Sequence, residues 1–271
     1  MELLLFSHDP AYSAAAIAAG VAKVVVDWEW SGKSVRQVGQ DTEINRGTLA
    51  DLVAAADVVG DRLICRVNNT PAGRDAECRL AIEHGASEIW LPMVRSVREI
   101  DECLRRIDGE AQLGILVETR ESMRLGRELQ QLPLSRIYIG LHDYRIDCAN
   151  TGLFDPIVDG TLDRFRADYS GALGFAGVTR PGGGSPIPQQ LLLAAMVRMG
   201  CAFGVARRSF RADVAAGSIS RTIAQIDACI DALALRSPEQ VIDDHLALTH
   251  RIDRLSAGPA QPVEWENACA P

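Results

Sequence analysis

The sequence lacks the features of several large classes of protein. It has no excess of basic residues: the formal net charge is −8 and the sequence pI is about 5.2, which argues against an electrostatic nucleic-acid binder. No apolar run approaches the length of a membrane span. The N-terminal stretch MELLLFSHDP has neither the basic region nor the cleavage site of a signal peptide. We therefore expect a cytoplasmic protein that binds neither nucleic acid nor membranes.

Paired or clustered cysteines are also missing. The seven cysteines are odd in number and scattered, and no two have the spacing CxxC. Reduced thiols in the core are therefore a better interpretation than disulfides or a zinc site. No linker marks a second domain. At 271 residues, 47% of them hydrophobic, the chain matches the size of a single (β/α)8 barrel.

Strand-like and helix-like segments alternate along almost the whole chain. Eight short apolar runs are typical of strands: residues 3–6, 24–26, 63–67, 88–94, 113–117, 137–141, 173–178 and 202–206. Helical patterns separate them, and two of these begin at capping sequences, Thr48 with Asp51 and Ser96 with Glu99. This alternation predicts a parallel sheet covered by helices, and eight repeats predict a closed α/β barrel of the TIM, or (β/α)8, type.

Two further helices are predicted after the eighth strand, at about 211–235 and 237–255. The second has proline at its first turn. It carries apolar residues partly on one face: Val241, Ile242, Leu246, Leu248 and Ile252. A barrel needs only eight helices, so this face must be buried against something. We predict one domain, residues 1–255, and a poorly ordered tail, 256–271, rich in Pro, Ala and Gly.

The segment 112–147 contains two strand-like runs that each stop at an acidic residue. The first run ends at Glu118 and the second, 137–141, is followed by Asp143. Between them, three- and four-residue steps predict a helix that carries Met123, Leu125, Leu129 and Leu132. Parallel strands place both acids at the C-terminal edge of the sheet. Two carboxylates there suit a hard divalent cation; solvated acids at strand ends are the alternative.

The other strand ends gather arginines on the same rim. On an acidic chain this implies an anionic substrate, and Arg66, after the third strand, suits a carboxylate clamped by two hydrogen bonds. Arg207 and Arg208 follow the eighth strand, where neutralisation of helix or carboxylate neighbours is favoured over substrate contact. The glycine run 182–184 lacks the Lys-Ser/Thr of a P-loop, so a flexible lid is favoured over a phosphate cradle.

Five strand ends together resemble one enzyme superfamily. In chain order they read VVVDWEW, CRVNN, IWLPMV, GILVET and IYIGLHDYRID. They are similar to the metal-dependent pyruvate aldolases of the 2,4-dihydroxyhept-2-ene-1,7-dioate aldolase and citrate lyase β-subunit superfamily. The similarity covers residues 1–147 and implies the barrel fold that the strand pattern predicts.

The resemblance also implies a cofactor and its ligands. Glu118 and Asp143 would hold a divalent metal ion, Mg²⁺ with Mn²⁺ or Co²⁺ as alternatives. Arg66 would neutralise the enolate oxygen of a bound pyruvate-like group. Asp27 and Glu29 would order the water molecules on the metal from its second shell.

The implied activity is that of a carbon–carbon lyase or aldolase. It would act through a pyruvate-like enolate on a small anionic carboxylate, a 2-oxo or hydroxy acid. Arg66, Trp30, Leu141 and His142 are the expected substrate contacts. The resemblance further implies a homo-oligomer, a hexamer or trimer, in which a neighbouring subunit covers the C-terminal helices.

The sequence departs from the family pattern at two places. The pyruvate aldolases have a histidine directly after the Glu of the second strand motif, where this chain has Trp30, and tryptophan cannot transfer protons in acid–base catalysis. Trp30 could instead pack against substrate or a neighbouring subunit, or form a stacking wall for a larger substrate. The stretch 174–208 closely resembles neither the aldolases nor the acyl-CoA lyases.

A replacement for the missing base must come from the same rim. His8 is the better candidate, because the first strand adjoins the second and brings His8 beside Asp27 and Glu29. His142 directly precedes a proposed metal ligand, and consecutive residues near a strand end face opposite ways. Packing or helix capping by the turn at 7–10 is the alternative for His8. We therefore place His8 and Asp27 with Arg66 among the catalytic residues.

Two other functions stay open. One is citrate-lyase-like cleavage of a 3-hydroxyacyl thioester, which needs a basic groove for CoA that the sequence does not clearly supply. The other is a non-catalytic ligand-binding barrel that has lost its base. Retention of Glu118, Asp143 and Arg66 argues against the second, since a charged cage is costly to assemble without its ion.

Overall fold

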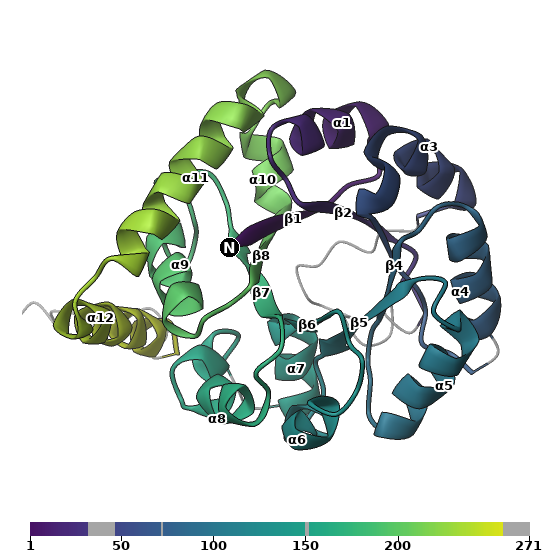
Figure 1. Cartoon of the computed structure of the whole chain (residues 1–271). Helices are drawn as coiled ribbons and strands as arrows, with labels where there is room; N and C mark the ends of the chain where they lie inside the picture. The colour runs from purple at the N-terminus through teal and green to yellow at the C-terminus, as the bar shows by residue number, and fades with distance from the viewer. Residues whose placement is uncertain (32–46, 72, 150–151, 257–271) are drawn as a thin grey trace, which may run out of the picture.

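A computed structural model of the chain describes residues 1–31, 47–71, 73–149 and 152–256. Eight parallel strands form a closed barrel (Figure 1). They are β1 (Glu2–Phe6), β2 (Lys23–Asp27), β3 (Leu63–Arg66), β4 (Glu88–Leu91), β5 (Gln112–Val117), β6 (Arg136–Ile139), β7 (Leu173–Val178) and β8 (Phe203–Ala206). Each strand pairs with the next, and β8 pairs with β1. The predicted (β/α)8 fold is confirmed. The predicted tail beyond Ser256 lies outside the described residues.

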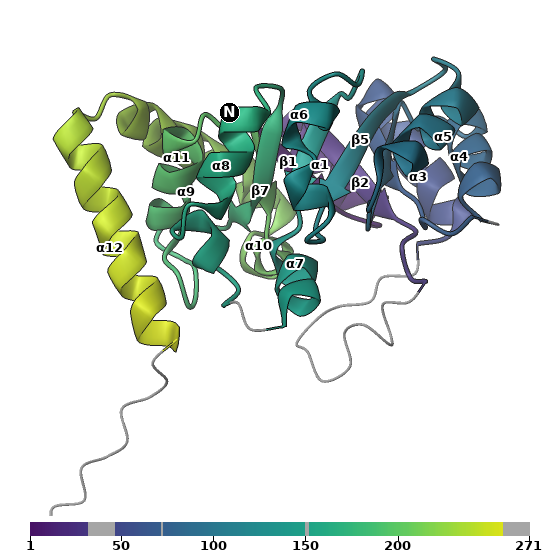
Figure 2. The same ribbon diagram turned by 90° about the horizontal axis from the view of Figure 1, so that it is seen from below.

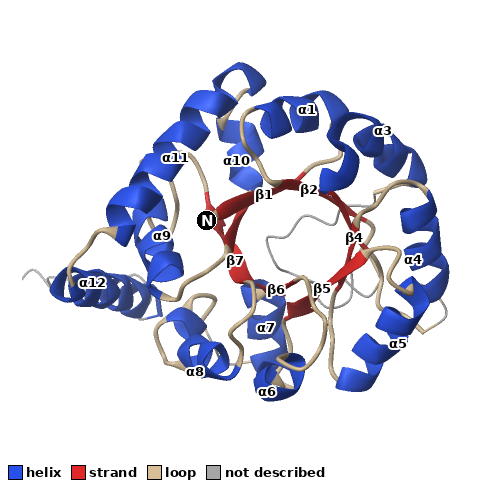
Figure 3. Ribbon diagram, viewed as in Figure 1, coloured by secondary structure: helices blue, strands red, loops and turns tan. Residues whose placement is uncertain are grey.

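Helices surround the barrel as a ring (Figure 3). They are α1 (Pro10–Ala18), α3 (Leu49–Val59), α4 (Arg74–Glu83), α5 (Val97–Ile107), α6 (Gly126–Leu129), α7 (Leu141–Cys148), α8 (Thr161–Asp168), α9 (Gln189–Arg198), α10 (Arg208–Asp213), α11 (Ile219–Ala234) and α12 (Pro238–Ser256). Short 3-10 helices lie at Gly60–Arg62 (η1), Ser122–Arg124 (η2), Asp155–Ile157 (η3) and Ala216–Ser218 (η4). Thr48 and Ser96 accept hydrogen bonds from the N–H groups of Asp51 and Glu99, so both predicted caps are confirmed. No helix in the described part of the chain is long and apolar enough to span a membrane.

The barrel interior is filled by apolar side chains from alternate strand positions. Its buried members are Leu4, Val25, Ile64, Trp90, Leu116, Phe203 and Val205. Trp90 stacks on Tyr138, with ring centroids 5.4 Å apart. Side chains two residues apart on a strand share a face. The inward positions that follow Val25, Ile64 and Leu116 are therefore Asp27, Arg66 and Glu118, and the packed core supports a layer of charged groups.

Two boundaries of the segment 112–147 were predicted wrongly. β6 ends at Ile139, and Leu141 begins α7, so Leu141, His142 and Asp143 lie in the first turn of a helix. The single helix expected between the two strands is replaced by η2 and the four-residue α6. Thr119 and Ser122 bond to each other's backbone N–H, a reciprocal pattern that starts η2, and Leu125, with ψ of 13°, separates η2 from α6.

Two further boundaries also differ from the prediction. The run expected to extend to residue 94 ends as β4 at Leu91, because Met93 has a positive φ of 51°, which a strand cannot contain. The long helix expected at about 211–235 is divided into α10 and α11. Val214 between them is extended, and its carbonyl oxygen accepts a hydrogen bond from the Tyr12 hydroxyl at 2.9 Å.

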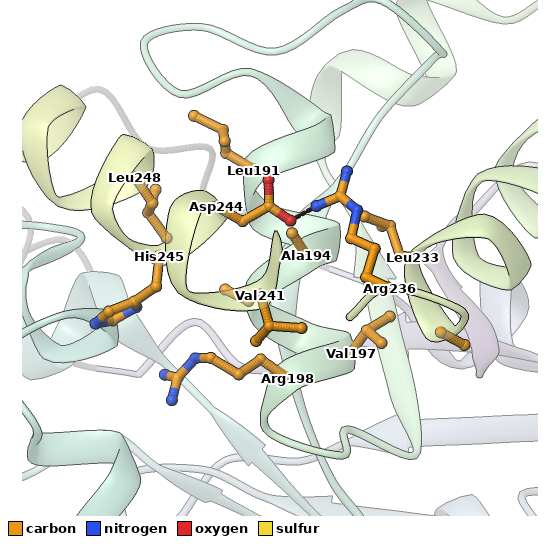
Figure 4. Close-up of a pocket in the computed structure, with 12 residues that line it drawn as sticks. Leu191, Ala194, Val197, Arg198, Leu233, Arg236, Val241, Asp244, His245 and Leu248 are labelled. Carbon is orange, nitrogen blue, oxygen red and sulfur yellow. Dashed lines mark ion pairs between the residues drawn. The ribbon is translucent and has the colours of Figure 1, made fainter. Parts of the chain in front are cut away.

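The C-terminal extension packs on its own barrel. α12 contacts α9, and Leu248 and Ile252 are buried there, whereas Ile242 and Leu246 are 58% and 48% exposed. Figure 4 shows the pocket between α9, α11 and α12, where Arg236 pairs with Asp244. The apolar residues of α12 therefore divide between a covered side and an exposed side.

Candidate active site

Arg66 and Asp27 form a buried ion pair at the C-terminal ends of β3 and β2. They are register partners in the sheet. The Asp27 carboxylate accepts hydrogen bonds from Nε of Arg66 at 2.8 Å and from Nη2 at 2.6 Å, and Nη1 lies 3.4 Å from Oε2 of Glu29. The arginine side chain is 13% exposed and the two carboxylates 1% and 2%. This two-point geometry fixes the plane of the guanidinium group.

A residue that the sequence analysis passed over lies beneath this arginine. The guanidinium carbon of Arg66 is 4.8 Å from the ring centroid of Phe6 at the end of β1, an attractive cation–π distance. Burial by itself lowers the pKa of Arg66, but the charges of Asp27 and Glu29 reverse this effect and hold that pKa well above its usual value. The guanidinium is therefore always charged.

Glu118, directly after β5, and Asp143, in the first turn of α7, are close enough for the charge of Asp143 to act on Glu118. Both are buried, with 2% and 8% of their surface exposed. Burial, the charge of Asp143 and the charge of Glu29 raise the pKa of Glu118 to about 8. Ionised carboxylates that repel each other in this way are stabilised by a cation, and their hard oxygen atoms suit a divalent one.

A metal ion at this pair would depend on water and substrate for its other ligands. Within the described ranges no group of three or more His, Cys, Asp and Glu side chains is arranged to hold a metal. Two carboxylates are nevertheless the usual protein contribution to a Mg²⁺ site, because this ion keeps several of its water molecules. The donor set of Glu118 and Asp143 therefore fits the predicted cofactor.

Backbone groups from two neighbouring strands position the Glu118 carboxylate. The N–H group of Met93, whose φ is positive, donates to Oε1 at 2.7 Å. Gly140 leaves the space on the other side, where a Cβ atom would lie only 2.8 Å from Cβ of Glu118. Neither Met93 nor Gly140 was predicted as a site residue, because a backbone N–H and an absent side chain leave little trace in a sequence.

His8 lies beside Asp27, as the strand order predicts. Its Nε2 accepts a hydrogen bond from the backbone N–H of Asp27 at 3.0 Å, so the ring proton of the neutral imidazole is on Nδ1. Asp9 caps α1 through a hydrogen bond from the Tyr12 N–H at 3.1 Å. The capping role of this turn belongs to Asp9, and the role of His8 in proton transfer stays a prediction.

Trp30 is held through its backbone. Its N–H group and that of Ser31 donate to Oδ1 of Asn68 at 3.0 and 2.8 Å, while Nδ2 of Asn68 donates to the carbonyl oxygen of Trp28 at 2.8 Å. The Trp30 residue is 51% exposed. Asn68, in the motif CRVNN, is a positioning residue whose role the motif alone does not reveal.

Leu141 and His142 lie on the same side of the barrel as the acid pair. Leu141 is 7% exposed and His142 is partly buried, both in the first turn of α7 with Asp143. α7 and α10 project at the end of the barrel opposite the N-terminus (Figure 2). The predicted site residues therefore gather at the C-terminal edge of the strands.

No protein-family model matches the chain, and no curated protein matches it. Solved structures do, although the sequences are distant. RipC from Yersinia pestis is 14% identical with a TM-score of 0.53, over 89% of this chain and 98% of that one. The likeness is one of fold. A citrate lyase from Burkholderia xenovorans LB400 is 14% identical with a TM-score of 0.56, over 94% and 82% of the two chains. The citrate synthase SbnG is 15% identical with a TM-score of 0.56, over 84% and 91%.

Proposed function

We propose that the protein is a metal-dependent carbon–carbon lyase or aldolase that acts through a pyruvate-like enolate on a small anionic 2-oxo or hydroxy acid. One observation carries the proposal: Glu118 and Asp143 form a buried carboxylate pair close enough to Arg66 for each charge to affect the pKa of Glu118. A cation site beside a fixed guanidinium group matches a substrate that carries a carboxylate and develops negative charge on an adjacent oxygen.

Glu118 and Asp143 would hold the metal ion, which, when bound, supplies a Lewis acid for the developing enolate oxygen. Arg66 has five N–H donors, and Asp27 uses two of them. The remaining donors serve Glu29 and the anionic substrate. Asp27 would act by holding the guanidinium plane, and Glu29 by adding a second negative charge that keeps Arg66 in place.

The names of two similar structures, a citrate lyase and a citrate synthase, support chemistry at carbon–carbon bonds. The likeness to a citrate lyase also favours one alternative, the cleavage of a 3-hydroxyacyl thioester. The pyruvate enolate enzyme and the thioester-cleaving enzyme differ in the molecule whose C–H group loses a proton. Exchange of the methyl protons of free pyruvate is expected of the pyruvate enolate enzyme and not of an enzyme that requires the thioester.

The test is proton–deuterium exchange into pyruvate, measured by NMR with Mg²⁺, Mn²⁺ or Co²⁺. Wild-type protein should catalyse metal-dependent exchange, and Glu118→Gln and Asp143→Asn should abolish both exchange and metal-linked thermal stabilisation. Glu121→Gln is the matched control, because Glu121 is an exposed carboxylate of the same loop that pairs with Arg95. An equal rise in melting temperature with metal in wild type and both site variants would contradict the proposal.

A further inference from the structure

Arg207 is a partly buried arginine that no described carboxylate neutralises. It directly follows β8, whose Phe203 and Val205 face the barrel interior, so it continues the inward-facing series at the C-terminal edge. Its Nη1 donates to the carbonyl oxygen of Ser185 at 3.0 Å. Its Nη2 is buried and has no hydrogen-bond partner among the residues that the structure describes. Burial lowers the pKa of Arg207, and no acidic residue of the described ranges counters this effect. The expectation that Arg207 neutralises a neighbouring carboxylate is therefore not met within the described part of the chain.

Its surroundings hold the guanidinium group in place. The guanidinium carbon lies 5.9 Å from the ring centroid of Phe154. Phe154 belongs to a turn in which the Gly152 N–H donates a hydrogen bond to the Asp155 carboxylate at 2.6 Å. On the other side, Arg251 of α12 donates to the carbonyl oxygen of Pro186 at 2.9 Å, next to Ser185. A partly buried cation whose buried Nη2 has no acceptor among the described residues is costly unless an anion pairs with it at some stage of function.

Arg207 lies on the same rim as the proposed active site. Phe154 and Ser185 belong to the connections that follow β6 and β7, at the C-terminal edge. α10, which follows Arg207, lies beside β8 and β1, whereas α7, which carries Asp143, lies beside β6 (Figure 1). In the strand order the acid pair of β5 and α7 falls between Arg66 on β3 and Arg207 after β8. The two arginines therefore flank the proposed metal site.

We propose that Arg207 binds a second carboxylate of the substrate, at the end remote from the carbon that becomes the enolate. This inference rests on the proposed function, which places the first carboxylate of the substrate beside Arg66 and the metal site. Asp27 and Glu29 already balance Arg66, whereas no described carboxylate balances Arg207, so a substrate with two carboxylates supplies the missing charge. A single guanidinium group matches one planar carboxylate in charge and shape. The substrate class is thus a 2-oxo or hydroxy dicarboxylic acid.

The experiment compares affinities for 2-oxo acids with and without the distal carboxylate. Dissociation constants are measured by calorimetry with Mg²⁺ for oxaloacetate, 2-oxoglutarate and 2-oxoadipate, each relative to 2-oxobutyrate. The three chain lengths cover different separations of the two carboxylates. The proteins are wild type, Arg207→Met, which keeps an unbranched side chain but removes the charge, Arg207→Lys, and Arg180→Met. Arg180 is the control, because its side chain is 55% exposed on the loop after β7.

Wild type and Arg180→Met should bind at least one dicarboxylate roughly tenfold or more tightly than 2-oxobutyrate, as expected for a hydrogen bond between charged groups. Arg207→Met should remove this preference, and Arg207→Lys should retain part of it. No preference in wild type, or an equal preference in Arg207→Met, would overturn the inference. Failure of the proposed function would be detected by a different measurement, because wild type would then catalyse no deuterium exchange into pyruvate.

Discussion

Gly140 lies directly against the side chain of Glu118, so that no Cβ atom fits between the end of β6 and this carboxylate. We predict that Gly140→Ala displaces Glu118 and lowers turnover and metal-linked stabilisation together, turnover by roughly 10²-fold, the effect of a misplaced catalytic geometry. Thermal unfolding with and without Mg²⁺ measures the second effect. Gly217→Ala is the control, because no atom lies within 4 Å of its added Cβ. Unchanged metal binding in Gly140→Ala would show that Glu118 is not a ligand.

The pH dependence of stability gives a second prediction. In the metal-free protein the pKa of Glu118 is raised to about 8, above its value in the unfolded chain. The native state therefore binds a proton that the unfolded state has released, and the free energy of unfolding should fall as pH rises from about 4.5 to about 8. Glu118→Gln removes this proton and should flatten that part of the profile.

Urea unfolding of metal-free protein across this pH range measures the effect, with Glu121→Gln as the control. Metal affinity should change in the opposite direction and increase up to about pH 8, because the ion must displace the same proton. An identical slope in Glu118→Gln and wild type would assign the pH dependence to other groups.

The sequence predicted the strands well because each is a short apolar run, and buried parallel strands admit almost no polar residue. The ends of these apolar runs also located the charged rim, because Asp27, Arg66 and Glu118 are the first polar residues on the inward face of β2, β3 and β5. The boundary at β6 was missed because IYIGL is apolar throughout. β6 ends at Ile139, one residue before Gly140, which lies against the Glu118 side chain, a contact between distant residues that no local pattern encodes.

Other site residues were missed for different physical reasons. Phe6 and Tyr138 read as core residues, and both pack against the interior cluster of the barrel. The ring of Phe6 also contacts the Arg66 guanidinium group, and Tyr138 is close enough to Arg66 and Glu118 for their charges to affect its pKa. Met93 acts through a backbone N–H that its positive φ directs at Glu118. Arg207 was assigned to charge neutralisation because only the structure shows that no described carboxylate reaches it.

The exposed side of α12 gives a third prediction. Ile242 and Leu246 remain 58% and 48% exposed, while Leu248 and Ile252 pack on the barrel. We predict that a neighbouring subunit covers the exposed pair, and that the double variant Ile242→Glu, Leu246→Glu dissociates a trimer or hexamer into monomers. Light scattering at micromolar concentration measures the mass. Arg254→Glu, an exposed charge change on the same helix, is the control. Wild type that is monomeric under these conditions would refute the prediction.

The last prediction concerns the base of the proposed reaction, since Trp30 stands where the pyruvate aldolases that the sequence resembles have a histidine. His8 accepts the Asp27 N–H through Nε2, so two roles must be separated: an acceptor that holds the end of β2, and a group that transfers protons. His8→Gln keeps an acceptor oxygen but cannot titrate, whereas His8→Leu removes both functions. A proton-transfer role predicts that both variants lower turnover by roughly 10²-fold with metal affinity unchanged. A positioning role predicts that His8→Gln retains turnover and only His8→Leu loses it. Unchanged turnover in both would exclude His8 and direct the search to metal-bound water or another group on the rim.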